Sequence, residues 1–463
     1  MVSLDDTIAA ISTPIGEGGI GIVRMSGPLA ADILRRLFSP GALHHRDAGA
    51  GTLEPYHLHY GHIIDPATGD VVDEVLAASM PAPRTYTRQE LVEIDAHGGV
   101  VAVRRILALC LEHGARLAEP GEFTLRAFLN GRIDLAQAEA VLDVVRARTD
   151  RALQTAVGQL AGHLSEQVRS VRAQLLDVLA HVEAGLDLMA DELPARDVAA
   201  DLAQAEARLQ ELLASADRGM IYRQGVRAAI VGRPNVGKSS LLNCLLRTSR
   251  AIVTDIPGTT RDTLEETLNL DGVPVVLVDT AGIAAATDDP IERLGIERSR
   301  RALDQADLAL LVVDASEPLT GADRVIAGLV GGKPAIVVLN KTDLVGPGDD
   351  RGPAPLLAAP AVSISALTGQ GIGALEQAIV EMVLSGQVAA SDVPVVSNPR
   401  HKERLSRALE HVVAALAAAQ AGLTADLVAI DLAAAVHALG QVTGQTAGDD
   451  LLENIFSHFC VGK

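Results

Sequence analysis

The sequence predicts a three-part fold: an α+β domain at the N-terminus, a helical domain in two segments, and an α/β domain with a mostly parallel sheet inserted between those segments. Three changes of pattern along the 463 residues support this prediction. Short β-like runs with glycine and proline occupy residues 1–119, and β-runs alternating with helices occupy 221–380. Alanine- and leucine-rich helical spacing covers 120–220 and resumes over 381–463, which indicates one host domain interrupted by an insertion.

The N-terminal region predicts strands and one helix. Gly18–Arg24 and Val71–Leu76 have the composition of strands, and Val100–His113 has apolar residues at helical spacing. Such a mixture, without strict β-helix alternation, is typical of an α+β domain.

The alanine-rich regions predict long helices. Helical spacing extends from Leu135 to Arg218, with its main break near Asp191–Pro194. It returns in Arg404–Gln420 and Asp426–Leu439.

Composition and charge limit the class of protein. A hydrophobic content of 48% with 21% charged residues is typical of a soluble globular chain. No apolar run approaches the roughly 20 residues that a membrane span needs, and the first residues do not resemble a signal peptide, so we expect a cytoplasmic protein without a membrane span. A net charge of −20 argues against a broad nucleic-acid-binding surface, so a function on RNA would require a local basic patch or a partner that holds the RNA.

The three cysteines are far apart, and none forms a C-x-x-C pair, which argues against a disulfide framework or a zinc site. We expect Cys110 and Cys244 to be small core residues. Cys460 lies in the last four residues of the sequence and is considered below.

A phosphate-binding loop is predicted between a strand and a helix. The apolar run Arg227–Val231 leads into Gly232–Ser239, which fits G-x-x-x-x-G-K-[ST], and Ser240–Leu246 follows with helical spacing. In such a loop the backbone amides surround the β-phosphate. Lys238 reaches the β- and γ-phosphates, and the Ser239 hydroxyl ligates Mg²⁺.

Three further motifs follow predicted strands in the order that a GTPase requires. Asp279–Gly282 supplies a carboxylate that reaches Mg²⁺ through water and an amide for the γ-phosphate. Asp343, at the end of Asn340–Asp343, can accept hydrogen bonds from N1 and N2 of guanine, a pattern that adenine lacks, and Ser363–Leu367 fits the loop behind the base. The motifs therefore predict GTP rather than ATP. The predicted GTP-binding residues are Asn235, Val236, Gly237, Lys238, Ser239, Ser240, Thr254, Asp255, Ile256, Pro257, Gly258, Thr259, Thr260, Asp279, Thr280, Ala281, Gly282, Asn340, Lys341, Thr342, Asp343, Ser365, Ala366 and Leu367.

Two positions concern hydrolysis. A switch-loop threonine must close on Mg²⁺ and the γ-phosphate, and Thr260 fits better than its neighbour Thr259. Ile283 follows Asp279–Gly282, where Ras-like enzymes have a glutamine that orients water. Because an isoleucine cannot orient water, we expect another residue to do so.

Asn235, together with Gly258–Asp262, resembles the potassium-activated TrmE/Era-like GTPases. The resemblance implies a K⁺ ion near the phosphates, held by Asn235 and by oxygens of Thr254, Ile256 and Thr259. Such a cation would neutralise charge that develops between the β- and γ-phosphates. The alternative is that Asn235 only forms a turn.

The flanking regions resemble the MnmE (TrmE) family of tRNA-modification GTPases over almost the whole chain. The Gly-Glu-Phe-Thr block and the Cys-x-Gly-Lys end are its most specific features. The matching segments are Asp6–Ile11, Gly18–Arg24, Tyr86–Thr87, Val92–Ile94, His97–Gly99, Pro120–Thr124, Arg126–Arg132 and Ile455–Lys463.

The resemblance implies an N-terminal domain that dimerises and binds 5-formyl-tetrahydrofolate or a related tetrahydrofolate. Arg24, Glu93, Arg132 and Lys463 match the folate-contacting positions of the family. Cationic groups suit the glutamate carboxylates of a folate, and an acid suits the N–H edge of its pterin. The alternative is that these four are ordinary surface or intersubunit charges.

The resemblance also implies a reaction and a partner. With the FAD-dependent MnmG subunit, in a heterotetramer, the family adds an aminomethyl or carboxymethylaminomethyl group to C5 of the wobble uridine of certain tRNAs. A partner that holds the tRNA fits the acidic chain. Cys460 falls on the family's cysteine and has an implied catalytic role as a thiolate; a buried small residue is the alternative.

By the same resemblance, Glu292 orients the water for hydrolysis. The chain departs from the family at Ala284–Ala286, where charged residues are usual, and at Gln441 and Gln445, where glutamate is usual. Because two carboxylates are lost at Gln441 and Gln445, any acid–base role near the C-terminal signature is in doubt.

Two other functions remain to be distinguished from tRNA modification. One is a regulatory or assembly switch with a vestigial folate domain, which the intact Cys460–Lys463 end disfavours. The other is direct ribosome or rRNA binding, which the acidic charge and the lack of an added basic domain disfavour.

Overall fold

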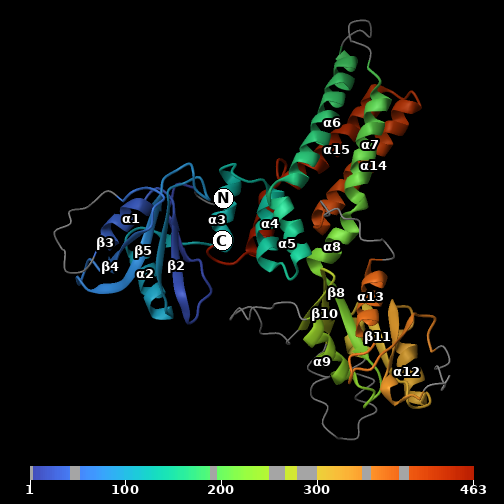
Figure 1. Ribbon diagram of the computed structural model, residues 1–463. Coiled ribbons are helices and arrows are strands. Elements are labelled where there is room, and N and C mark those ends of the chain that lie inside the picture. Colours follow the sequence, from blue (N-terminus) through green and yellow to red (C-terminus); the bar gives the residue numbers. More distant parts are fainter. Residues whose placement is uncertain are drawn as a thin grey trace. The chain divides into compact units, whose positions relative to one another are not determined.

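The computed structural model describes residues 4–41, 53–187, 196–249, 266–278, 300–346, 356–384 and 396–463. The described residues form two compact units. The first unit contains 4–142 and 439–463, and the second unit contains the described residues between 143 and 438. The mixed architecture of α/β and helical parts is as predicted (Figure 1).

The first unit is built on one mixed sheet whose strands lie in the order β3-β4-β5-β6-β2-β1-β7. All neighbours are antiparallel except β1 and β7, which are parallel. The strands are β1 (Ile8–Ile11), β2 (Gly18–Ser26), β3 (Phe38–Pro40), β4 (His59–Ile64), β5 (Val71–Met80), β6 (Leu91–Gly98) and β7 (Arg116–Leu117).

Two helices, α1 (Ala30–Leu37) and α2 (Val100–Glu112), cover one face of this sheet. Alternate residues of the strands face them, because strand side chains point to opposite faces in turn. Val92 and Ile94 are buried on the helix side, for example, whereas Glu93 is only half-buried on the other side. The α+β prediction, with its strands and its helix from Val100, is therefore confirmed. Cys110 is a core residue, and burial raises the pKa of its thiol to about 12.

Helices also complete the first unit. α3 (Glu122–Leu129), the beginning of α4 (Leu135–Arg146) and α16 (Asp449–Ser457) share one apolar cluster. Phe456 and Phe459 from the end of the chain pack in it, with ring centroids 5.4 Å apart. The C-terminal residues are thereby attached to the N-terminal half of the chain.

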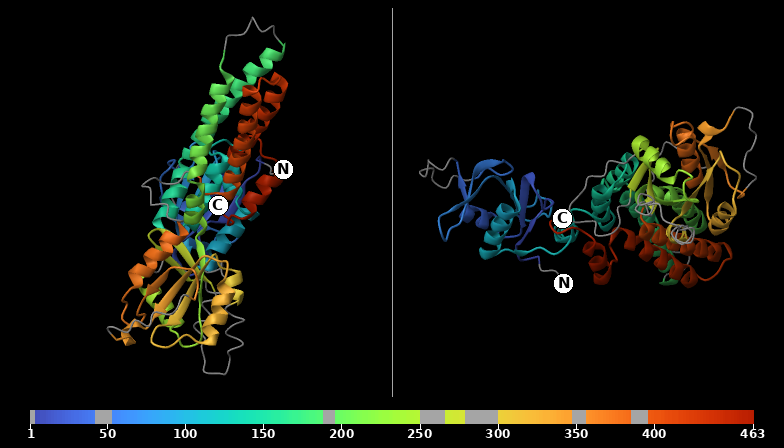
Figure 2. Two further views of the ribbon diagram at one scale, coloured as in Figure 1. Left: turned by 90° about the vertical axis from the view of Figure 1, so that its right-hand side faces the viewer. Right: turned by 90° about the horizontal axis from the view of Figure 1, so that it is seen from below.

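The second unit begins with helices from both sides of the α/β segment. The first group is α5 (Asp150–Leu160), α6 (His163–Asp187), α7 (Val198–Ala214) and α8 (Ala216–Gln224), and the second is α14 (Pro399–Gln420) and α15 (Ala425–Thr443). α7 and α14 lie side by side, as the two views of Figure 2 show. The prediction that helices before and after the insert belong together is confirmed, and the predicted break at Asp191–Pro194 lies outside the described residues.

Of the described helices, α15 alone has the length and apolar composition of a membrane span. This is weak evidence for a membrane, since 44% of that stretch is buried inside the protein. The α15 residues also make polar contacts to neighbouring helices: Arg172 of α6 donates to the Val436 carbonyl, and Asp431 pairs with His411 of α14. These are contacts of a packed helix in a bundle.

The inserted α/β part contains a six-stranded sheet in the order β13-β12-β11-β8-β10-β9. All pairs are parallel except β9 with β10. α9 (Lys238–Ser249) and α13 (Ile372–Val383) cover one face, and α12 (Gly321–Val330) covers the other. The strands are β8 (Val226–Val231), β9 (Glu266–Leu270), β10 (Val273–Val278), β11 (Leu308–Asp314), β12 (Ala335–Asn340) and β13 (Ala361–Ser363).

Every predicted nucleotide motif in this sheet follows the carboxyl end of a strand. The phosphate loop follows β8, Asn340–Asp343 begins at the end of β12, and the base loop follows β13. Since parallel strands end at the same edge, the three loops lie along one edge of the sheet, where open α/β sheets bind their ligands.

Candidate functional site

The phosphate loop has a backbone that its residue types allow. Asn235 has φ +63°, a left-handed conformation that asparagine tolerates better than most residues. Gly237 has φ +97°, and a Cβ there would lie 2.2 Å from the Asn340 amide nitrogen. Only glycine therefore lets the loop approach the end of β12 this closely. The turn-forming role of Asn235 is present, and it is compatible with the predicted K⁺ contact.

Lys238 points back into its own loop. Its ammonium donates to the carbonyl oxygens of Gly232 at 2.9 Å and Arg233 at 2.8 Å. Burial lowers the pKa of Lys238 to about 8. A partly buried cation whose described partners are two neutral carbonyls favours an incoming anion, and the phosphates of a nucleotide fit this requirement. Ser239, the predicted Mg²⁺ ligand, stands in the first turn of α9 beside Lys238.

Asn340 connects the phosphate loop to the base loop. Its side-chain amide donates to the Val236 carbonyl at 2.8 Å, and its side-chain oxygen accepts from the Ala366 amide at 3.0 Å. Asn340 is 2% exposed, so these bonds are made away from water. Its side chain therefore organises two nucleotide loops.

Asp343 is held in place by the base loop. The Ser365 hydroxyl donates to one carboxylate oxygen of Asp343 at 2.6 Å, and the Thr368 amide donates to the same Ser365 hydroxyl. One oxygen of Asp343 is thus oriented by the protein, and the carboxylate keeps acceptor capacity for a guanine. Leu367, 85% exposed, lies at the open side of this loop.

The sequence did not predict two ion pairs at this edge of the sheet. Lys341, with φ +66°, pairs with Asp314 at the end of β11 at 2.6 Å. Burial alone would raise the pKa of Asp314, but hydrogen bonds from Lys341 and Ser316 hold it below its ordinary value. Arg233 of the phosphate loop pairs with Glu317. Asp314 ends β11 and Glu317 follows it, and β11 is not followed by any of the predicted nucleotide motifs. The sequence therefore contained no signal for either acid.

The remaining predicted GTP and ion contacts cannot be described. Thr254–Thr260, Asp279–Gly282 and Glu292 lie outside the described residues, as do Ala284–Ala286. The described nucleotide residues are those of the phosphate loop, the end of β12 and the base loop, and the fold brings all three together.

The four predicted folate residues lie in the first unit. Arg24 of β2 stands opposite Glu93 of β6 in the sheet register, and the two side chains pair at 2.7 Å. Arg24 also donates to the carbonyl of Gly462 at 3.2 Å. Gly462 has φ +95° and passes so close to β1 that a Cβ would lie 2.6 Å from the Ile11 carbonyl oxygen. The C-terminal end therefore joins Arg24 and Glu93 at one place.

Two aromatic rings extend this group. The Arg24 guanidinium lies 5.8 Å from the centroid of Phe123, and the Arg132 guanidinium lies 4.8 Å from that of Tyr86. Phe123 and Tyr86 belong to the same apolar cluster. Phe123 is fully buried, so the accessible part of this group consists of Arg24, Glu93, Arg132 and the partly buried Tyr86 ring. This combination suits a flat heterocycle with carboxylates.

Lys463 and Cys460 complete the C-terminal end. Burial, and to a smaller extent the positive charge of Arg24, lowers the pKa of Lys463, although Cys460 acts in the opposite direction. Cys460 is exposed, so the alternative of a buried small residue is wrong. Its backbone carbonyl accepts from the amide of Gly121 at 3.3 Å, which holds the cysteine beside α3.

Comparisons with known proteins cover the whole chain. The family model described as GTP-binding protein TrmE N-terminus matches residues 7–132, and the one described as MnmE helical domain matches residues 135–460. Three relatives named tRNA modification GTPase MnmE come from Roseiflexus sp. (strain RS-1), Chloroflexus aurantiacus and Geobacillus kaustophilus. They are 51%, 50% and 49% identical, and the matches span 99% of this chain and 99%, 100% and 99% of theirs. The chain belongs to the MnmE family.

Solved structures match about a third of the chain. The G domain of the T. maritima FeoB iron transporter is 27% identical and covers 34% of this chain and 98% of its own, with a TM-score of 0.26. Translation elongation factor SelB from Methanococcus maripaludis is 23% identical, covers 35% of each chain, and has a TM-score of 0.27.

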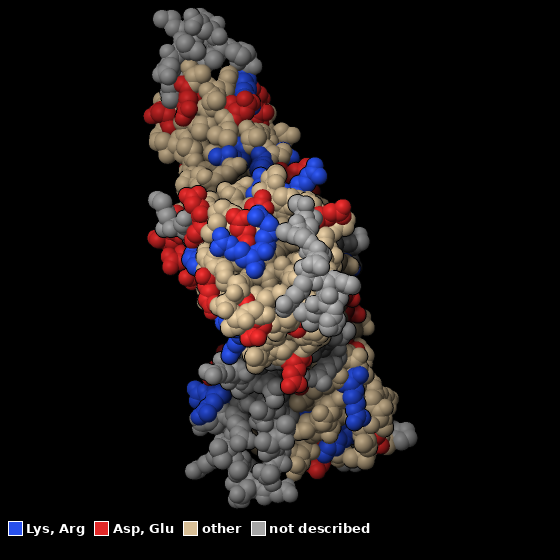
Figure 3. Space-filling model, turned by 90° about the vertical axis from the view of Figure 1, so that its left-hand side faces the viewer, with Lys and Arg blue, Asp and Glu red and all other residues tan. Residues whose placement is uncertain are grey.

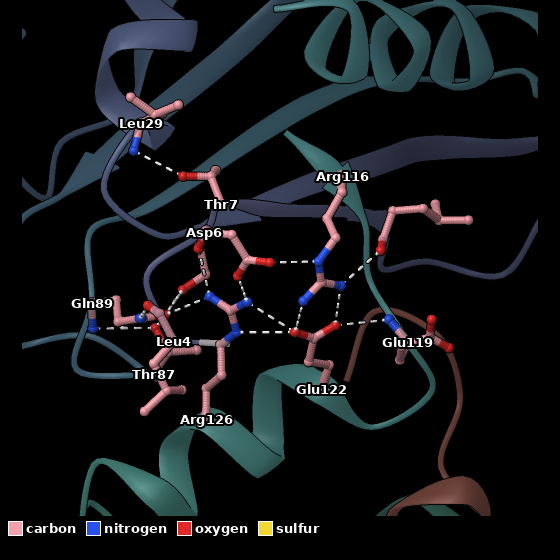
Figure 4. Close-up of polar contacts among 12 residues, drawn as sticks. Leu4, Asp6, Thr7, Leu29, Thr87, Gln89, Arg116, Glu119, Glu122 and Arg126 are labelled. Atoms are coloured by element: carbon pink, nitrogen blue, oxygen red, sulfur yellow. Dashed lines mark hydrogen bonds and ion pairs between the residues drawn. The ribbon is translucent and has the colours of Figure 1, made fainter. Parts of the chain in front are cut away.

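The Gly-Glu-Phe-Thr block, which supported the resemblance to the MnmE family, is part of an ion-pair network in which Arg126 and Glu122 are buried and Arg116 and Asp6 are partly exposed (Figure 4). Arg126 pairs with Asp6 at 2.5 Å and with Glu122 at 2.9 Å. Arg116 pairs with the same two acids, both at 2.6 Å. Gln89 accepts from Arg126 and donates to the Leu4 carbonyl. This network attaches Leu4 and Asp6 to α3, the helix that also contains the buried Phe123.

The surface charge agrees with an acidic MnmE-family chain. On the face in Figure 3, basic side chains form small groups separated by acidic and uncharged ones. In the described part of the chain, no three His, Cys, Asp or Glu side chains are grouped as a metal site.

Proposed function

We propose that this protein hydrolyses GTP and, with an FAD-dependent partner, adds an aminomethyl or carboxymethylaminomethyl group to C5 of the tRNA wobble uridine. The observation that carries the proposal is membership of the MnmE family along the full chain, with the nucleotide loops assembled at one sheet edge. GTP is selected because the base loop presents an oriented Asp343 carboxylate to the guanine edge.

In the proposed hydrolysis, Lys238 leaves its two carbonyl partners and binds the β- and γ-phosphates. Ser239 and Thr260 would hold Mg²⁺, which neutralises phosphate charge when bound. Asp279 would reach that ion through water, and the Gly282 amide would meet the γ-phosphate. The amides around Gly237 would surround the β-phosphate, where the N-terminus of α9 favours negative charge. Glu292 would orient the attacking water.

We also propose that the GTPase is activated by K⁺, with Asn235, Thr254, Ile256 and Thr259 as its ligands. The left-handed backbone of Asn235 within the phosphate loop supports this. GTP turnover should be at least about tenfold faster in KCl than in NaCl of equal ionic strength, because a charge-neutralising group at the transferring phosphate contributes several kcal/mol. Equal rates in the two salts would exclude a K⁺ site.

In the same assay, wild-type turnover by Glu292→Ala would show that another group orients the water.

For the second site we propose a tetrahydrofolate bound by Arg24, Glu93, Arg132 and Lys463. The contact of Arg132 with the partly buried Tyr86 ring, together with the Arg24–Glu93 pair, supports this assignment. Cys460 would act beside it as a thiolate, which its exposure permits. Homodimerisation through the first unit, a heterotetramer with the MnmG subunit, tRNA held mainly by that subunit, and a cytoplasmic location belong to the same proposal.

The test is a rescue experiment with tRNA nucleosides as the readout. Cells that lack this chain should lose the C5-aminomethyl-type uridines in digested bulk tRNA, measured by mass spectrometry. Wild type should restore them. Lys238→Ala should not, because the phosphate-binding cation is gone, and Arg132→Ala should restore them poorly while its GTP turnover remains.

The alternative, a regulatory switch with a vestigial folate domain, predicts a different pattern. The wobble nucleosides would be unchanged in the deletion, and purified protein would not bind 5-formyl-tetrahydrofolate at micromolar concentration. Arg132→Ala would then behave as wild type in every assay.

A further inference from the structure

The β9–β10 hairpin of the inserted sheet contacts the turn between α4 and α5. Its turn consists of Asp271 and Gly272, with φ +48° and +88°, so both central residues are left-handed, as in the tightest hairpin turns. The Asn269 side chain accepts from the Gly272 amide at 3.0 Å and closes the turn. The hairpin is therefore a rigid two-stranded ribbon.

Thr149 joins the helical part to this ribbon. It is the N-cap of α5, where its hydroxyl oxygen accepts from the Ala152 amide at 3.2 Å. The same hydroxyl donates to the Gly272 carbonyl at 2.8 Å. Thr149 is 6% exposed, so the bond is protected from water. One hydroxyl thus both starts a helix and holds the hairpin turn.

Two neighbours strengthen the attachment. Arg148 donates to the Thr267 hydroxyl of β9 at 3.2 Å, and Thr267 is 2% exposed. Arg151 packs against the turn so closely that a Cβ on Gly272 would lie 2.4 Å from its Cγ. On the other side of the hairpin, Gly225 passes against Pro274 of β10 with no room for a Cβ. The ribbon is held by the helical part from two directions.

The sheet topology places this attachment at the opposite end of the ribbon from the nucleotide loops. β10 is parallel to β8, so its first residue lies at the edge of the sheet opposite the phosphate loop. At the far ends of the ribbon, Val278 directly precedes Asp279, and Glu266 lies six residues after Thr260. Both ends therefore lie near in sequence to the two loops predicted to contact the γ-phosphate and Mg²⁺. A five- to six-residue ribbon spans about 17–20 Å, so it connects the nucleotide edge to α5 across the sheet.

We propose that Arg148 and Thr149 are positioning residues that couple the nucleotide state to the helical part through the β9–β10 ribbon. A change at the γ-phosphate displaces the ribbon along its length, and the Thr149–Gly272 bond transmits that displacement to the start of α5. The inference rests on the proposed GTP chemistry, but it does not depend on tRNA modification. In this proposal the ribbon is the element whose position differs between the two nucleotide states, which coupling between distant sites requires.

The test compares hydrogen exchange of the full chain with GDP and with a non-hydrolysable GTP analogue. In wild type, exchange of the α5 amides should differ between the two nucleotides by at least about threefold, since local opening reports small changes in contact free energy. Thr149→Asp should abolish that difference, because a carboxylate still caps the helix but cannot donate to the Gly272 carbonyl. Thr149→Ser keeps both bonds and should behave as wild type.

A second variant tests the other side of the contact. Gly272→Ala places a Cβ against Arg151 at a left-handed position, so it should also abolish the difference. GTP turnover of Thr149→Asp should stay within about twofold of wild type, as the contact is remote from the phosphates.

The outcomes separate the proposals. An unchanged nucleotide-dependent difference in Thr149→Asp and Gly272→Ala would overturn the coupling, as would the absence of any difference in wild type. If the α5 amides of a variant exchange faster by the same factor with GDP and with the GTP analogue, the variant has lost the N-cap of α5. That result would also contradict the coupling. Since exchange is read without tRNA, a failure of the tRNA proposal would appear only in the nucleoside experiment.

Discussion

Asp343→Asn is expected to convert the preference for GTP into a preference for XTP. The Asp343 carboxylate offers only acceptors to the base, which matches the N1–H and N2–H donors of guanine. Each hydrogen bond to a charged group contributes about 1.5–3 kcal/mol. An asparagine oxygen can still accept from N1–H, but its NH2 group faces the N2–H donor and the negative charge is lost from both contacts, so kcat/KM for GTP should fall by about 10²–10⁴-fold. Xanthine has a carbonyl oxygen at position 2, which the asparagine amide can bind as a donor. The measurement is kcat/KM for both nucleotides.

A matched control is Asp307→Asn, which makes the same change of charge at the opposite edge of the sheet. Asp307 precedes β11 and accepts from the Arg227 amide at 2.9 Å. This variant should keep the preference for GTP. If Asp343→Asn hydrolyses GTP like wild type and does not use XTP, the base is bound elsewhere and the assignment of Asn340–Asp343 is wrong.

The nucleotide edge could be predicted because its determinants are local. Each motif follows an apolar strand directly, and parallel strands place their ends at one edge whatever their order in the sheet. The glycines of the phosphate loop occupy left-handed positions that other residues avoid, so they are visible in the sequence. What the motifs do not contain is the contact between them: the bonds from Asn340 to Val236 and Ala366 join residues 104 and 26 positions apart.

The contacts that hold the parts together could not be predicted in this way. Arg126 and Asp6 are 120 residues apart, and Thr149 and Gly272 are 123 apart, with no spacing rule connecting either pair. A threonine before a helix predicts an N-cap, but nothing in the sequence predicts that its hydroxyl also donates to a hairpin turn. The folate residues were found only because they match family positions; the pairing of Arg24 with Glu93 and Gly462 required the sheet register.

Arg126→Met is expected to lower the stability of the first unit by about 3–5 kcal/mol, because removing one partner leaves a buried charge uncompensated. Arg126 is fully buried and Glu122 is 1% exposed. With Arg116 and Asp6 they form a group of two positive and two negative charges (Figure 4). The substitution leaves two carboxylates with Arg116 alone. Since the chain has two units, the measurement is native-state hydrogen exchange of the β1 and α3 amides rather than one unfolding curve.

A second variant tests whether the equal number of positive and negative charges in this group stabilises the unit. Arg126→Met combined with Glu122→Gln removes one charge of each sign and leaves the Arg116–Asp6 pair, so it should be more stable than Arg126→Met alone. Arg105→Met is the surface control: Arg105 pairs with Asp65 but is 42% exposed, so the loss should be about 1 kcal/mol or less. If the double variant is as unstable as the sum of its single changes, the four groups do not act as one neutral network. The Gly-Glu-Phe-Thr block would then stabilise the unit through the packing of Phe123 rather than through its charges.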